Sequence, residues 1–136
     1  MLRSNFTQQR VLIVGDGSLF ESCVTYVLTD DTDFVVTRQT YSDDLVFLNT
    51  IKLNRPDVIL VCESSSFDPS RILDLVSSHS MAVELPIFVV RLYKNTIDVY
   101  ENRTPSERKK SPARKRIITR TGADLRNAIR RKYNDQ

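Results

Sequence analysis

The stretch RVLIVGDG, from Arg10 to Gly17, decides how the rest of the chain is interpreted. Its run of aliphatic residues is typical of a buried central strand in a parallel sheet, and a helical pattern follows directly after the glycines. In an open α/β sheet, ligands bind beyond the carboxyl ends of the strands, where this turn is expected to lie. Asp16 is therefore the first candidate for a functional residue.

Length and composition indicate a single compact domain. The chain has 136 residues, of which 40% are hydrophobic, and this is enough for one core. We expect a domain over residues 10–133, with short tails at 1–9 and 134–136. Its apolar runs are far shorter than the roughly 20 residues of a membrane-spanning helix, so no membrane association is expected. The polar N-terminus lacks the apolar core of a secretory signal, which favours a cytoplasmic location.

Hydrophobic periodicity predicts alternating strands and helices in the first two thirds of the chain. Strand patterns alternate with amphipathic helical patterns, and short polar turns separate them. Such an order predicts right-handed crossovers and, with one further strand near the C-terminus, a three-layer, doubly wound, five-stranded parallel sheet of the flavodoxin-like type. The predicted strands cover 10–15, 34–37, 57–62 and 87–92, and the predicted helices cover 18–29, a segment from Ser42 to about Ile51, and a segment opened by Asp68 and Pro69.

The pattern changes after the fourth predicted strand. A turn signal at 93–95 precedes an alternating stretch over 96–100, which predicts a β-hairpin in the place of the fourth helix. Residues 101–116 are interpreted as a basic, solvated loop. A short fifth parallel strand is predicted over 116–119, and a final helix follows a capping-box pattern formed by Thr121 and Asp124.

Four segments of the chain resemble the receiver domain of two-component response regulators. They are VLIVGD at 11–16, RPDVILV at 55–61, LPIFVV at 85–90 and DLRNAIR at 124–130, so the resemblance covers nearly the whole length. Such domains transfer a phosphoryl group from the histidine of a sensor kinase to their own aspartate. The resemblance implies an acidic pair holding Mg²⁺ after the first strand, an acceptor aspartate after the third, a serine or threonine after the fourth and a lysine after the fifth.

The resemblance places few of these groups in this chain. The acidic pair falls on Gly15 and Asp16, so one carboxylate is kept. The acceptor position falls on Cys62, and the hydroxyl position on Arg91. The lysine position falls among three residues, Ile118, Thr119 and Arg120.

The resemblance therefore implies a pseudo-receiver, which keeps the fold without the phosphorylation site. We expect a stand-alone, non-enzymatic module of phosphorelay-type signalling that binds a partner protein. It needs no cofactor, and Mg²⁺ would matter only in the alternative, an active receiver phosphorylated at a non-standard site such as Glu63.

The individual pocket residues have structural as well as functional interpretations. Asp16 is the only metal-ligand candidate, and it could equally cap the following helix. Arg91 could replace Mg²⁺ by forming an ion pair with Asp16. Cys62 at a strand end is expected to act as a small hydrophobe, with no disulfide to Cys23. His79 is expected to pack or cap at a helix end.

Basic residues are concentrated near the C-terminus. Residues 103–120 hold eight lysines and arginines against one acid, in a chain whose net charge is only +3. This segment is interpreted as a solvated insertion, a docking site for an acidic partner, or a nucleic-acid contact. The partner is expected on the surface formed by the fourth and fifth strands and the last helix, either as a different protein or as a second copy, with strand addition at an exposed edge as one mode. The candidate binding residues are Arg108, Lys109, Lys110, Arg114, Lys115 and Arg116.

Overall fold

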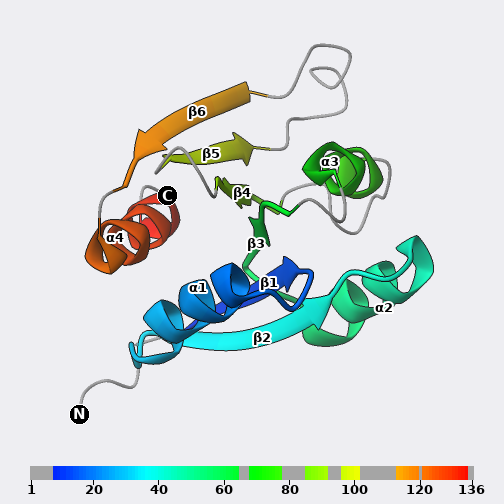
Figure 1. The fold of residues 1–136 in the computed structure, drawn as a ribbon, viewed down its shortest axis with the longest axis horizontal. Helices are drawn as coiled ribbons and strands as arrows, with labels where there is room; N and C mark the ends of the chain where they lie inside the picture. The colour runs from blue at the N-terminus through cyan, green and yellow to red at the C-terminus, as the bar shows by residue number, and fades with distance from the viewer. Residues whose placement is uncertain are drawn as a thin grey trace.

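The computed structural model describes residues 8–64, 68–77, 85–91, 96–101, 113–119 and 121–134. Within them, four helices and a six-stranded, mostly parallel sheet form an α/β fold (Figure 1). The strands are β1 (Gln9–Gly15), β2 (Phe34–Thr40), β3 (Val58–Cys62), β4 (Ile87–Val90), β5 (Thr96–Glu101) and β6 (Ala113–Ile118). The helices are α1 (Leu19–Thr29), α2 (Asp44–Asn54), α3 (Pro69–Ser77) and α4 (Gly122–Asn134).

The sheet has the strand order β2-β1-β3-β4-β5-β6. Pairing is parallel from β2 through β4, and antiparallel on both sides of β5. Five strands therefore run in one direction and β5 runs against them. The prediction of a hairpin after the fourth strand is confirmed by the antiparallel β4–β5 pairing, although its turn at 93–95 lies outside the described residues.

Two sequence predictions about the sheet were wrong. The sheet has six strands and not five, because β5 is inserted between β4 and the last parallel strand. That last strand also begins at Ala113, within the segment interpreted as a loop. Its first four residues, Ala-Arg-Lys-Arg, carry no apolar alternation, so tertiary pairing with β5 decides their conformation.

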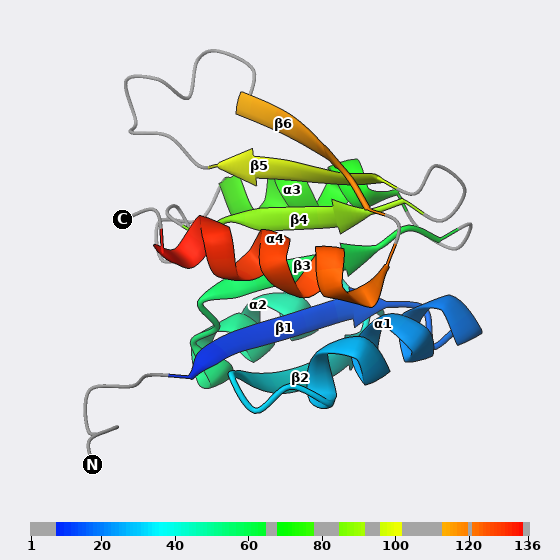
Figure 2. The same ribbon diagram turned by 90° about the vertical axis from the view of Figure 1, so that its left-hand side faces the viewer.

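Helices cover the sheet on both faces, as the doubly wound order predicts (Figure 2). Apolar side chains of α1 and α4 pack on one face, and those of α2 and α3 pack on the other. The central strands β1, β3 and β4 are buried along almost their whole length, which explains their continuous aliphatic sequences. None of the described helices is long and apolar enough to cross a membrane.

Capping groups fix where the helices begin. The Ser18 hydroxyl accepts a hydrogen bond from the Glu21 amide at the start of α1, as expected from its position. Asp43, and not Ser42, caps α2. The predicted capping box of α4 is present, since Thr121 and Asp124 each accept a hydrogen bond from the other's amide. These caps set the turns that lie at the carboxyl edge of the sheet.

Candidate functional site

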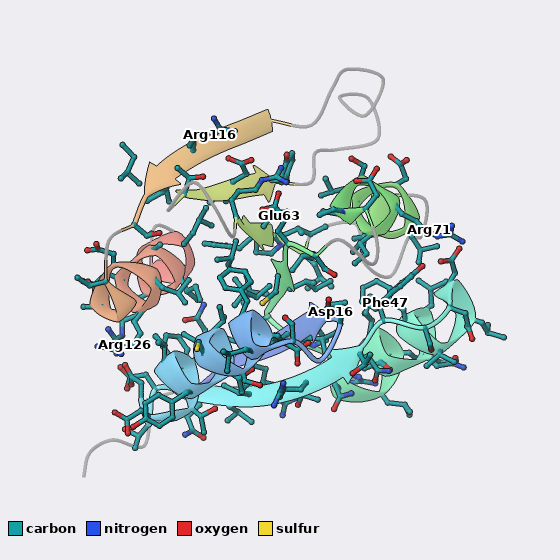
Figure 3. All side chains as sticks on the ribbon, viewed as in Figure 1. Asp16, Phe47, Glu63, Arg71, Arg116 and Arg126 are labelled. Carbon is teal, nitrogen blue, oxygen red and sulfur yellow. The ribbon has the colours of Figure 1, made fainter. Side chains whose placement is uncertain are left out.

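Asp16 lies at the carboxyl end of β1 and is held by hydrogen bonds within the chain. Figure 3 shows Asp16 at the end of this strand. The Ser64 hydroxyl, just beyond β3, donates to Asp16 Oδ2 at 2.5 Å, and the Ser18 amide donates to Oδ1 at 3.0 Å. These bonds stabilise the carboxylate and lower the pKa of Asp16 to about 2, the Ser64 bond having the larger effect. Asp16 is thus an ionised, oriented acceptor that joins the ends of two strands.

Gly15 leaves a space that another carboxylate fills. Glu21 is only 1% exposed, and its side chain lies against the Gly15 Cα. A Cβ atom at position 15 would come within 2.9 Å of both Glu21 Cγ and Cδ, and closer still to Oε1. Gly15 has no positive φ, so it is required for space and not for backbone conformation. A helix-borne carboxylate therefore occupies the place of the side chain that position 15 lacks.

The Glu21 carboxylate is neutralised by the chain itself. Its Oε1 accepts a hydrogen bond from the Gly17 amide at 2.8 Å. Its Oε2 pairs with the Arg38 guanidinium of β2, with the Nη2–Oε2 distance at 2.5 Å and Nε–Oε2 at 2.7 Å. The buried carboxylate thus has both a backbone donor and a cation that approaches it through two nitrogens, the arrangement that a buried charge needs. Sequence reasoning did not identify Glu21 or Arg38.

The donor set at this edge does not fit Mg²⁺. The resemblance implies two carboxylates after the first strand, but Gly15 supplies none and the oxygens of Glu21 are engaged by Arg38 and Gly17. Among the described residues, no three histidine, cysteine or acidic side chains are grouped so as to hold a metal ion. Octahedral Mg²⁺ would have to rely on Asp16 as its single side-chain anion at this position.

Cys62, the residue on which the resemblance places the acceptor, is a core residue. It is 1% exposed and belongs to the apolar cluster between the sheet and helices α1 and α4. Burial, together with the nearby Glu21 and Asp16 carboxylates, raises the pKa of the thiol to about 12. Because the thiolate is the nucleophilic form, Cys62 is not an activated nucleophile.

Thiol reactivity tests this placement directly. Cys23 is exposed on α1, whereas Cys62 is buried. Native protein titrated with Ellman's reagent at neutral pH is expected to release one equivalent of thionitrobenzoate promptly, from Cys23, and the second only in denaturant. The Cys23→Ser variant should show no prompt release. Rapid reaction of that variant without denaturant would contradict the burial of Cys62.

Arg91, just beyond β4, does not pair with Asp16, and that prediction was wrong. Its guanidinium binds Glu63 at 3.2 Å and Asp98 at 3.0 Å. Glu63 directly follows β3 and Asp98 lies on β5, so the two acids come from the strands on either side of β4. Asp16 follows β1, which is separated from β4 by β3, and each strand adds about 4.8 Å. The inserted strand β5 thus supplies a nearer carboxylate.

Asp98 joins two arginines on the face of the sheet that α3 covers. It is fully buried, and its Oδ1 also pairs with Arg116 Nε of β6 at 2.8 Å. Burial alone would raise the pKa of Asp98, but hydrogen bonds from Arg116 and Arg91 overcome this and leave it lowered. Against the opposing effect of burial, hydrogen bonds to Asp98 and Glu63 raise the pKa of Arg91. We call Glu63, Arg91, Asp98 and Arg116 the Asp98 cluster.

An open pocket of about 530 Å³ lies beside Asp16, between the starts of α2 and α3. At its rim, Tyr41 donates to Asp44, and Arg71 of α3 binds the same carboxylate at 3.2 Å. Asp43 and Asp68 stand at the starts of the two helices, where their side chains accept backbone hydrogen bonds. The helix ends are thereby already satisfied by carboxylates, which disfavours an anionic ligand there.

The remaining predicted residues are spread over different places. Thr119 lines a separate groove between α1 and α4, which also includes Arg91. Arg114, Lys115 and Arg116 are in β6. Other predictions lie outside the described residues, namely those for Arg120, His79 and the loop residues Arg108, Lys109 and Lys110.

The structure therefore brings Gly15, Asp16 and Cys62 together and draws Arg91 into the Asp98 cluster. Glu21 fills the space beside Gly15 and pairs with Arg38, so the strand edge is occupied by groups that satisfy one another. Comparison with protein-family models and with curated proteins gives no match for this chain.

Proposed function

We propose that this protein is a pseudo-receiver that acts in phosphorelay-type signalling by binding a partner protein, without aspartyl phosphorylation. The proposal rests on the receiver-like sequence segments and on an α/β fold compatible with that class. The observation that carries it is the Glu21 carboxylate in the space beside Gly15, paired with Arg38. Phosphoryl transfer needs that edge open to a metal and a phosphate.

The acceptor position supports the same conclusion. Cys62 lies in the apolar core with a strongly raised pKa, so it offers neither a carboxylate nor a thiolate to an incoming phosphoryl group. Glu63, which could substitute as an acceptor, is engaged by Arg91. A pseudo-receiver of this kind signals through the surface that binds its partner protein.

Chemical phosphorylation tests the proposal. The protein is incubated with acetyl phosphate and Mg²⁺, beside an active receiver domain as positive control, and the intact masses are measured. We expect the control to gain one phosphoryl group and this protein to gain none, because its would-be acceptor is buried and unactivated. A stoichiometric gain would overturn the proposal and favour a receiver with a non-standard acceptor. Repeating the reaction with Glu63→Gln would then show whether Glu63 is that acceptor.

A further inference from the structure

Strand β6 forms one edge of the sheet. It stands last in the strand order and pairs only with β5 among the described strands (Figures 1 and 2). An edge strand presents a row of backbone donors and acceptors to which another extended chain can pair. The alternation of backbone hydrogen bonds along β5 and β6 determines which residues of β6 present these donors and acceptors.

One hydrogen bond fixes which residues of β5 bond toward β4 and which bond toward β6. The Arg91 amide donates to the Thr96 carbonyl at 2.9 Å, so the backbone groups of Thr96 point toward β4. Successive residues of an antiparallel strand point alternately to its two neighbours. Ile97 therefore points toward β6, where its register partner is Ile117. By the same alternation, the amide and carbonyl groups of Arg116 and Ile118 point outward from the sheet edge.

The side chains of these two residues are suited to contact an added strand. Ile118 is 67% exposed, a large apolar surface on an edge strand. Arg116 is also exposed, although one side of its guanidinium binds Asp98. The strand carries three consecutive basic residues and no acid, and the basic segment 103–110 precedes it in the sequence.

Charge decides between the possible occupants of this edge. A second copy paired antiparallel through β6 would bring basic residues opposite basic residues, which is destabilising. An acidic strand would place carboxylates opposite Arg116 and Arg114 and an apolar residue opposite Ile118. We propose that β6 binds an extended acidic segment of a partner protein as a seventh strand. This inference rests on the proposed protein-binding function and names its surface and the chemistry of its partner.

The geometry specifies a probe peptide. In antiparallel addition, residues of the peptide separated by two positions lie opposite Ile118, Arg116 and Arg114 in turn. The fluorescein-labelled peptide Thr-Val-Thr-Glu-Thr-Glu-Thr, with blocked ends, places valine opposite Ile118 and the two glutamates opposite the arginines. The backbone amide of its first glutamate then points toward β6, and that of the threonine before it points away.

Fluorescence anisotropy with this peptide tests the proposal. We expect saturable binding that weakens with added salt, and loss of binding when the amide of the first glutamate is N-methylated. N-methylation of the preceding threonine should leave the affinity nearly unchanged. In the protein, Ile118→Pro removes one outward amide without touching the β5–β6 hydrogen bonds, and we expect it to weaken binding about tenfold. The matched Ile118→Thr keeps the amide and should cost only about threefold.

The outcomes separate the two proposals. Circular dichroism of Ile118→Pro, unchanged from wild type, confirms that the variant is folded. No saturable binding, equal binding of both N-methylated peptides, or unaltered affinity of folded Ile118→Pro would overturn strand addition. Self-association that Ile118→Pro abolishes, without peptide binding, would overturn the acidic partner in favour of a second copy. Phosphorylation by acetyl phosphate alongside specific peptide binding would overturn only the proposed lack of phosphorylation.

Discussion

Replacing Asp98 by alanine is expected to lower the free energy of unfolding by about 3 kcal/mol. The reason is that Asp98 is fully buried and forms ion pairs with two arginines. Its removal leaves half-buried Arg91 without its nearest anion and Arg116 without its buried ion-pair partner. Urea denaturation followed by circular dichroism measures the change. Asp44→Ala is the matched control, since the Asp44–Arg71 pair is exposed to solvent and its loss should change stability little.

The same residue makes stability depend on pH. Because the pKa of Asp98 is lowered on folding, the unfolded chain binds its proton more readily. The contribution of Asp98 to the free energy of unfolding is complete above the ordinary aspartate pKa of about 3.9. It is lost as the pH falls through the lower pKa that Asp98 has in the folded state. Asp16, with a pKa of about 2, acts in the same direction. The urea midpoint should therefore decrease as the pH is lowered from about 5 to about 2. Asp98→Asn should make this dependence of the midpoint on pH less steep. A slope that Asp98→Asn leaves unchanged would contradict the role given to the cluster.

Replacing Gly15 by alanine is expected to destabilise the protein by about 2 kcal/mol, a typical cost of overpacking. The added Cβ would collide with the Glu21 side chain, which has little room to move because it is buried and tied to Arg38 and Gly17. Gly15→Asp, which would add the carboxylate that the receiver resemblance implies, should be worse because it adds an anion beside Glu21.

The other glycine of the turn provides the control. Gly17 has a φ of +80°, but a Cβ added there would meet no heavy atom within 4 Å, so it has space where Gly15 has none. Gly17→Asn should be tolerated, since asparagine adopts left-handed conformations readily. Urea denaturation of Gly15→Ala and Gly17→Asn measures the free energy of unfolding of each variant. Equal stability of Gly15→Ala and wild type would contradict tight packing of Glu21 against Gly15.

Much of the fold could be predicted because burial leaves a direct mark on the sequence. The runs at 11–14, 58–62 and 87–90 are continuous and apolar since both faces of these strands are covered. The hairpin could be predicted from the alternation over 96–100. The start of β6 could not, because its basic residues lie on an edge strand, where burial imposes no apolar pattern.

The candidate site was harder to predict because its contacts join segments distant in sequence. Glu21 did leave a signal, since it stands three and seven residues before Val24 and Leu28 on the buried stripe of α1. Asp98 left another signal, because it is a charged residue within a strand of alternating apolar and polar residues. The partner of Arg91 could not be read from the sequence, because it depends on β5 being inserted next to β4.

The most direct test of this account is a double-mutant cycle between Gly15 and Glu21, measured by urea denaturation. The variants are Gly15→Ala, Glu21→Ala and the two combined. If the Glu21 carboxylate fills the space beside Gly15, alanine at position 15 costs about 2 kcal/mol with Glu21 present and close to nothing after Glu21→Ala, a coupling of about 2 kcal/mol. An equal cost of Gly15→Ala in both backgrounds would contradict the claim that the chain closes this edge with its own carboxylate.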